Sequence, residues 1–238
     1  MKHYFSLFLI LIISALLSAC NVGSNHSNQE TVLATDYTTT SCSKDYVDEF
    51  MSIICEAELG GLSAGFKLDA EHCYNVTPLS VAVQTDIKIF KFSDSCVSLA
   101  LIDGKAYSIC ESFGGFGFVN AVPWDYDDDG NLDLLVASSW GSGLHRSIIS
   151  IFDTSTKESN IVYDTSTTNN PSVDLVVAAV TPSLSSKDPN DLPVYYQVYI
   201  AQIEVNDNNL ADLSYCPMSL IGSVVVENEI PVFKTMEE

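Results

Sequence analysis

Most of the chain beyond residue 80 consists of segments typical of β-strands, and in the first of them, residues 80–92, hydrophobic and polar positions alternate as in a half-buried strand. These segments are rich in Val, Ile, Phe and Tyr, which favour the pleated surface of a sheet. They cover residues 80–92, 97–102, 106–110, 174–180, 194–205 and 223–233. The turn dipeptide Asp103-Gly104 joins two of them as a hairpin, so we expect mostly antiparallel β-structure.

One segment near the start of this region has a helical period instead. Between Lys44 and Leu59, apolar residues recur at spacings near the helical repeat, at Val47, Met51, Ile54 and Cys55. Ser43 can cap the start of such a helix, and Gly60-Gly61 can end it. The sequence therefore predicts a mostly β fold with antiparallel sheets and one short N-terminal helix.

The hairpin at Asp103-Gly104 can form in two registers. A two-residue turn directs Cys96 and Cys110 to opposite faces of the sheet. A three-residue loop with a left-handed glycine brings Cys96 directly opposite Cys110. Only the second register permits a Cys96–Cys110 disulfide. We expect three disulfides among the six cysteines after Cys20, with Cys96–Cys110 as the first of them.

The first twenty residues have the layout of a secretory signal. Lys2 precedes an apolar run from Leu7 to Leu17, which is short for a membrane-spanning helix of about 20 residues. The ending Leu17-Ser18-Ala19-Cys20 resembles the lipobox of bacterial lipoproteins, which implies cleavage before Cys20 and diacylation of its thiol. Residue 21 is Asn rather than the Asp that favours inner-membrane retention, so the resemblance implies the outer membrane.

The predicted organisation has three parts. Residues 1–19 form a lipoprotein signal peptide, residues 20–40 a flexible tether from the lipidated cysteine, and residues 41–238 a β-rich domain. Removal of the signal takes away one lysine and no acidic residue, so the formal charge moves from −21 to about −22. Such a charge repels a phosphate backbone, so we expect no nucleic-acid partner. The lipid anchor implies contact with a membrane.

Cysteine usage fits an exported protein. After Cys20 the chain holds six cysteines: Cys42, Cys55, Cys73, Cys96, Cys110 and Cys216. An even number in an oxidising compartment favours disulfide bonds. A zinc site is the rival interpretation, but the chain has no CxxC pair and few histidines.

The strongest chemical signal is an acidic loop between two apolar segments. Three aspartates alternate, Gly130 follows and permits a sharp turn, and a fourth aspartate comes four residues after the third. Calcium takes roughly six to eight oxygen ligands, which alternating carboxylates in a tight loop can supply. We therefore expect Ca²⁺ to be bound by Asp125, Asp127, Asp129, the carbonyl of Asn131, and Asp133. The alternative is a solvated acidic turn.

The surroundings of the loop distinguish between known calcium motifs. An EF-hand needs a glutamate at position 12, where this chain has Val136, and the exit from the loop has the composition of a buried strand. Residues 116–138 instead resemble the FG-GAP and related VCBS repeats, the calcium-loop blades of integrin α-type propellers: Phe116-Gly117, Ala121, the aspartate loop and the apolar exit follow that order. The resemblance leaves a small β-propeller-like domain and a β-sandwich both open.

Two degraded copies of the loop pattern follow at residues 166–174 and 204–212. As repeats they imply units of about 40 residues. The alternative is chance similarity. Most of their carboxylates are replaced by Ser, Thr or Asn, so we expect no metal there.

A second candidate site lies just after the predicted exit strand. Trp140, His145 and the only arginine of the chain, Arg146, share one Gly-rich segment, which is typical of a binding face on a loop. The alternative is a hairpin whose polar groups face solvent.

Together these features predict a membrane-anchored, calcium-stabilised binding lipoprotein of the bacterial envelope, whose ligand is a protein or a glycan. The alternative is a periplasmic hydrolase on the same β scaffold. Gly61-Leu62-Ser63-Ala64-Gly65 matches the GxSxG pattern, but the strand and helix that a nucleophile elbow requires are missing around it. We therefore nominate no catalytic residue.

Overall fold

The computed structural model describes residues 40–41, 48, 50–53, 70–93, 97–110, 114–141, 144, 146–168, 172–181, 193–206, 210–213 and 218–236. All of them belong to one compact unit, Leu33–Glu238. The predicted signal peptide, Cys20 and nearly all of the tether lie outside the described residues. Within the described part, no helix is long and apolar enough to cross a membrane.

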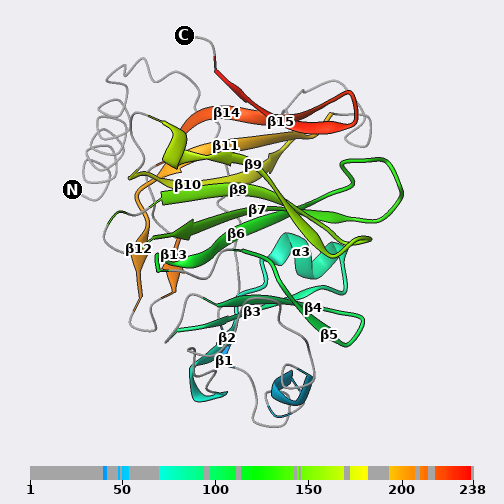
Figure 1. Ribbon diagram of the computed structural model, residues 1–238, viewed down its shortest axis with the longest axis vertical. Coiled ribbons are helices and arrows are strands. Elements are labelled where there is room, and N and C mark those ends of the chain that lie inside the picture. Colours follow the sequence, from blue (N-terminus) through cyan, green and yellow to red (C-terminus); the bar gives the residue numbers. More distant parts are fainter. Residues whose placement is uncertain are drawn as a thin grey trace, which may run out of the picture. The chain divides into compact units, whose positions relative to one another are not determined.

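The first sheet has five antiparallel strands that are neighbours in chain order (Figure 1). They are β1 (Thr40–Ser41), β2 (Cys73–Asn75), β3 (Lys88–Phe92), β4 (Ser98–Ile102) and β5 (Lys105–Ser108). A short 3-10 helix, η1 (Ala70–His72), leads into β2, and helix α3 (Leu79–Gln84) connects β2 to β3. Residues 48 and 50–53 are helical, as predicted for this part of residues 44–59. Phe50 is fully buried, and the centroids of the Phe50 and Phe90 rings are 4.0 Å apart.

Helix α3 differs from the strand that the alternating pattern of residues 80–92 predicts. Pro78, with extended backbone, is its N-cap, and Thr85 ends it by donating a hydrogen bond from Oγ1 to the Val81 carbonyl (2.9 Å). Val81 is fully buried whereas Val83 is 75% exposed, so the two valines do not share one face of a strand. Packing of Val81 against the sheet outweighs the β-propensity of this segment.

The hairpin between β4 and β5 takes the two-residue register. Ile102 pairs with Lys105, and both turn residues have positive φ, 49° at Asp103 and 73° at Gly104. This is the geometry of a type I′ turn, whose twist matches that of the flanking strands. The three-residue register is therefore wrong, and the Cys96–Cys110 disulfide loses its geometric basis. Cys96 itself lies outside the described residues.

The second sheet is a meander of four antiparallel strands, again in chain order. They are β6 (Gly117–Trp124), β7 (Asp133–Trp140), β8 (Arg146–Asp153) and β9 (Glu158–Asp164). The 3-10 helix η2 (Thr165–Thr167) leads on to the third sheet, which comprises β10 (Asp174–Val180), β11 (Tyr195–Ala201), β14 (Met218–Glu227) and β15 (Ile230–Thr235). A small hairpin interrupts it, formed by β12 (Glu204–Val205) and β13 (Ala211–Asp212).

The sheets pack on one another through buried apolar faces. One hydrophobic cluster joins α3 and the first sheet to the second through residues such as Ile89, Leu134 and Phe152. Strand β10 packs across β6, β7 and β8, next to a bulge in β6. There the buried Asn120 donates to the Val177 carbonyl (2.7 Å) and accepts from its N–H (3.1 Å). This pair satisfies backbone groups that would otherwise be buried without partners.

The prediction of a mostly β, antiparallel fold is confirmed. The sequence leaves a β-propeller-like domain and a β-sandwich open. The described strands form stacked, sandwich-like sheets, and they do not close into a barrel. The first two sheets are built from strands that follow one another along the chain, and the third departs from this order only by the inserted β12–β13 hairpin, so most strand pairing is local in sequence. The acidic loop joins the first two strands of the second sheet.

Candidate functional site

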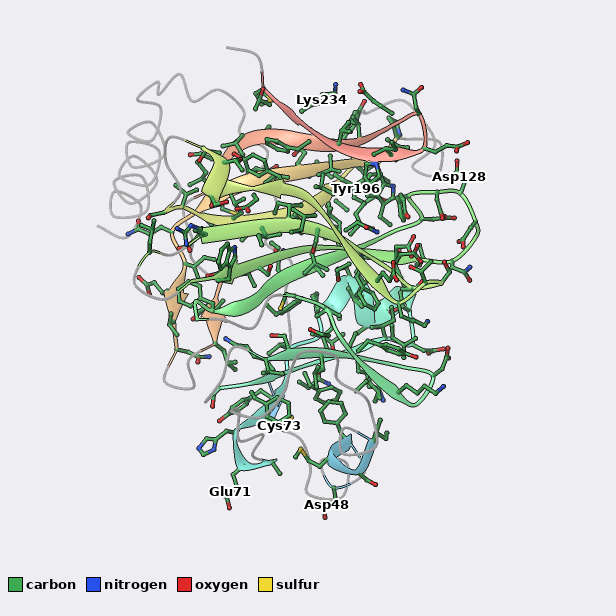
Figure 2. The ribbon with its side chains drawn as sticks, in the orientation of Figure 1. Asp48, Glu71, Cys73, Asp128, Tyr196 and Lys234 are labelled. Carbon is green, nitrogen blue, oxygen red and sulfur yellow. The ribbon has the colours of Figure 1, made fainter. Side chains whose placement is uncertain are left out.

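The acidic loop is a hairpin connection, as predicted. Strand β6 ends at Trp124, and β7 begins at Asp133. Two loop residues have left-handed backbone, Asp128 (φ 58°) and Gly130 (φ 86°). A Cβ at Gly130 would meet nothing within 4 Å, so backbone conformation, and not space, favours glycine there. Figure 2 shows Asp128 at the outer tip of this loop.

The three alternating aspartates converge inside the loop. One carboxylate oxygen from each of Asp125, Asp127 and Asp129 lies within 4.8 Å of the others. Backbone amides hold these carboxylates in place: Gly130 N–H donates to Asp125 Oδ2 (3.1 Å), and Asn131 N–H donates to Asp129 Oδ1 (2.7 Å). The sequence prediction that these three side chains share one point is therefore met.

One oxygen of this cluster has no partner. Oδ1 of Asp125 is buried, and no hydrogen-bond donor reaches it in the described structure. A buried carboxylate oxygen without a donor is costly unless a cation takes the donor's role. Hard carboxylate oxygens are the ligands that Ca²⁺ prefers, so this donor set fits the ion.

Asn131, expected to ligate through its carbonyl, is exposed. Its side-chain Nδ2 donates to Asp129 Oδ2 (3.0 Å), and this hydrogen bond links the two residues on either side of Gly130. Ligation by its carbonyl stays a prediction.

Asp133, the fourth predicted carboxylate, is outside the group of three. It is 3% exposed, and its Oδ1 accepts hydrogen bonds from the N–H (2.7 Å) and Oγ1 (3.2 Å) of Thr154. Burial raises the pKa of Asp133 to about 6, against the lowering effect of the Thr154 bonds and with a further rise from the charges of Asp153 and Asp127. Ligation of a cation by Asp133 stays a prediction.

The turn between β8 and β9 is therefore part of the site, and sequence reasoning missed it. Thr154 Oγ1 also lies 3.1 Å from the Leu132 carbonyl, so its single proton is shared between that oxygen and Asp133 Oδ1. Lys157 Nζ donates to the Thr154 carbonyl. Burial alone would raise the pKa of Asp153, but hydrogen bonds from Ser155 and Thr156 lower it. The run Asp153-Thr154-Ser155-Thr156 has the composition of a turn, but its contact with Asp133 depends on how β7 pairs with β8.

Aromatic side chains pack at the start of the loop. The ring of Trp124 stacks on that of Tyr196 with centroids 4.3 Å apart, and Tyr126 meets Trp124 edge-on at 6.3 Å. Burial raises the pKa of Tyr196, and the negative charge of Asp125 raises it further. These rings join the start of the loop to the third sheet.

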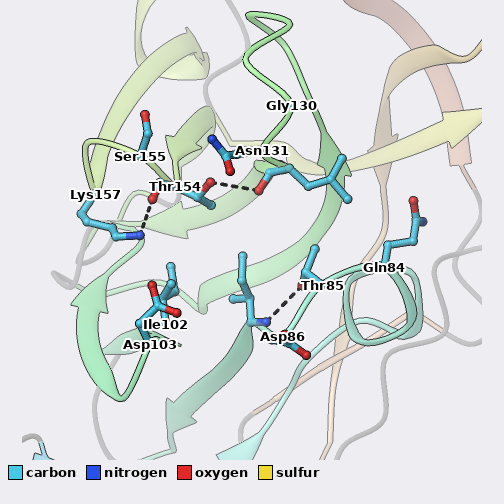
Figure 3. Close-up of a pocket in the computed structure, with 12 residues that line it drawn as sticks. Gln84, Thr85, Asp86, Ile102, Asp103, Gly130, Asn131, Thr154, Ser155 and Lys157 are labelled. Carbon is cyan, nitrogen blue, oxygen red and sulfur yellow. Dashed lines mark hydrogen bonds between the residues drawn. The ribbon is translucent and has the colours of Figure 1, made fainter.

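A pocket of about 530 Å³ opens beside the loop (Figure 3). Four segments line it: the end of α3 and the start of β3, the β4–β5 turn, the end of the acidic loop, and the β8–β9 turn. The lining residues are Gln84, Thr85, Asp86, Ile87, Ile102, Asp103, Gly130, Asn131, Leu132, Thr154, Ser155 and Lys157.

The second candidate site lies far from this pocket. Trp140 and Arg146 pair across β7 and β8, and the Arg146 guanidinium carbon lies 5.1 Å from the Trp140 ring centroid, a cation–π contact. Asp133 and Trp140 begin and end β7, so about 24 Å of strand separates the two candidate sites. His145 lies outside the described residues.

The degraded copies of the loop pattern occupy different structural positions. Residues 166–174 connect β9 to β10, and so pass from one sheet to the next. Residues 204–212 span the small β12–β13 hairpin. Only the intact loop joins successive strands of a main sheet, so the copies are not equivalent positions of a repeat.

Comparisons with models of protein families, with curated proteins and with solved structures each found no match. The resemblance to FG-GAP and VCBS repeats therefore stays a prediction from residues 116–138. The disulfides beyond the hairpin also stay predictions, because only Cys73 and Cys110 are among the described residues.

Proposed function

We propose that this chain is a calcium-stabilised binding protein, anchored by a lipid on Cys20 to a membrane of the bacterial envelope and recognising a protein or glycan. The observation that carries the calcium assignment is the convergence of Asp125, Asp127 and Asp129 around a buried oxygen that lacks a donor. Like charges at this separation repel, and a divalent cation turns the repulsion into attraction.

The bound ion would act as a structural clamp. Asp125, Asp127 and Asp129 would hold it at the end of β6, and Asp133 Oδ2 would extend its coordination to the start of β7. Because Asp133 also accepts two bonds from Thr154, the ion would secure the β8–β9 turn as well. Calcium contributes stability and charge neutralisation there, and no chemical step is required of it.

Thermal unfolding with calcium and with chelator tests this proposal. At a free calcium concentration ten times the Kd, binding to the folded state raises the free energy of unfolding by about 1.4 kcal/mol. For a domain of about 200 residues this corresponds to a rise of roughly 3–5 °C in melting temperature. Asp129→Ala should abolish the rise. Asp128→Asn removes one charge from the loop tip, at a residue outside the converging group, and should keep it. Equal melting temperatures with calcium and chelator in the wild type would contradict the proposal.

The anchor rests on Leu17-Ser18-Ala19-Cys20 and on the apolar run before it. Cys20→Ser should yield a precursor that takes up no fatty acid, whereas the wild type should be labelled and fractionate with the outer membrane. Metabolic labelling with a fatty acid, followed by membrane fractionation, measures both. Equal incorporation into the two proteins would rule out the lipid on Cys20.

A further inference from the structure

The pocket beside the acidic loop is lined by both apolar and polar residues. We call its three apolar lining residues, Ile87, Ile102 and Leu132, the floor, and its polar lining residues the rim; Ile87 and Ile102 are 6% and 8% exposed. The hydrogen-bonding side chains of the rim come from all four lining segments (Figure 3). A volume of about 530 Å³ is in the range of small-molecule sites.

Part of the rim is uncommitted. Within the described part of the chain, the side chains of Gln84, Asp86 and Asp103 make no hydrogen bond or ion pair. The β8–β9 turn is already engaged, because Thr154 bonds to Asp133 and Ser155 bonds to Asp153. The groups left for a ligand are therefore carboxylate and amide groups, most of them acceptors.

We propose that this pocket binds a neutral or amino sugar unit of a glycan, an inference that rests on the proposed binding function and names its ligand class. A sugar ring offers C–H surface to an apolar floor and hydroxyl donors to acceptors around it. Carboxylates accept hydrogen bonds from hydroxyl groups roughly twice as strongly as neutral acceptors do. Asp86, after α3, and Asp103, in the β4–β5 turn, supply such acceptors from two different lining segments.

Charge sets the second part of the specificity. The one cationic side chain of the lining, Lys157, donates to the Thr154 carbonyl and lies 5.7 Å from the Tyr107 ring centroid. Its charge is therefore held at the β8–β9 turn, while the two carboxylates are uncompensated. Acidic sugars are repelled by this rim and bind more weakly than their neutral counterparts.

Calcium and sugar binding are coupled through shared walls. Gly130, Asn131 and Leu132 end the acidic loop and line the pocket. Thr154 lines it too, and is held by Asp133. An ion that orders the loop therefore orders two sides of the pocket, and the two ligands should raise each other's affinity by the same factor.

Isothermal titration of the full chain in detergent, with calcium present, tests the inference. The probes are methyl glucoside, methyl galactoside, N-acetylglucosamine, glucosamine, glucuronic acid and methylamine. At least one neutral or amino sugar should bind, glucuronic acid should bind more weakly, and methylamine should not compete. Combined Asp86→Asn and Asp103→Asn substitutions should weaken sugar binding about tenfold, the loss expected for hydrogen bonds to charged groups.

The variants separate this inference from the calcium assignment. Asn suits the left-handed turn position of Asp103, so the double variant should keep both its fold and its calcium-induced rise in melting temperature. Glu229→Gln, at the positive-φ turn between β14 and β15, removes one negative charge at a residue outside the pocket lining and should bind sugar as the wild type does. In Asp129→Ala, calcium should change neither the melting temperature nor the affinity for sugar.

Several outcomes overturn the inference. They are an absence of sugar binding while calcium still raises the melting temperature, sugar binding that the double variant leaves unchanged, and full competition by methylamine, which would indicate a simple cation site. The first of these leaves the calcium-stabilised protein intact and redirects its ligand to a protein.

Discussion

Asp133 has a different environment from the other aspartates of the loop. It lies at the first position of β7, is 3% exposed, and shares its Oδ1 between two donors of Thr154. Burial raises its pKa from 3.8 to about 6. Between these two values the folded protein binds more protons than the unfolded chain, so the stability that protonated Asp133 contributes is complete below pH 3.8 and is lost as pH rises through about 6.

This sign gives a prediction for the ion-free protein. In chelator, raising the pH from about 4 to 7 should lower the free energy of unfolding of the wild type relative to Asp133→Asn, by about 3 kcal/mol at most. Asparagine keeps an oxygen acceptor for Thr154 and carries no charge. Urea unfolding at a series of pH values measures the difference. If the free energy of unfolding changed with pH in the same way for both proteins, the pKa of Asp133 would not be raised in the folded state.

The loop residues of the site could be predicted from the sequence, and their partners could not. Alternating aspartates followed by Gly130 are a local pattern, and the hairpin geometry that it predicts is observed. Thr154 and Asp103 come from other hairpins. Their positions depend on how β7 pairs with β8 and on how the first and second sheets pack, which no short sequence pattern encodes.

At the scale of elements, strands were predicted better than the connections between them. Segments rich in β-branched and aromatic residues predict β3 to β5, β10, β11, β14 and β15, and the acidic hairpin predicts β6 and β7. The predicted strands do not include β8 and β9, and β6 to β8 are buried on both faces, which removes the period-two signal. Alternation also fails at α3, whose buried residue, Val81, packs in the cluster between the first two sheets. The same residues allow a two-residue and a three-residue register for the β4–β5 hairpin. The backbone geometry of the turn decides between these registers, and the composition of the turn does not.

Two turn glycines form a matched pair for an element-scale prediction. Gly104 (φ 73°) and Gly130 (φ 86°) each have open space where a Cβ would stand, so alanine meets only the strain of a left-handed backbone. Gly104→Ala and Gly130→Ala should each cost about 1–2 kcal/mol. Only Gly130→Ala should also weaken calcium binding. Urea unfolding in chelator, paired with calcium titration, measures both effects; equal loss of calcium affinity in the two variants would contradict the assignment.

At the scale of the whole molecule, two features bear on function. The formal charge of −21 makes the chain strongly acidic, so it attracts cations, and a divalent ion is a suitable counter-charge for the loop aspartates. The sheets are joined near the loop by the Trp124–Tyr196 stack and within the core by Asn120 and Val177. Stabilising the loop therefore stabilises a junction between sheets, which is why calcium should raise the stability of the whole domain.

Terbium luminescence tests the calcium site most directly. Tb³⁺ replaces Ca²⁺ at oxygen sites and emits when a nearby tryptophan is excited. The chain has two tryptophans: Trp124 adjoins Asp125, and Trp140 lies at the far end of β7. We predict sensitised emission that calcium displaces, that Trp124→Phe and Asp129→Ala abolish, and that Trp140→Phe preserves. Emission that is absent from the wild type, or that depends on Trp140 instead, would contradict a cation site at Asp125, Asp127 and Asp129.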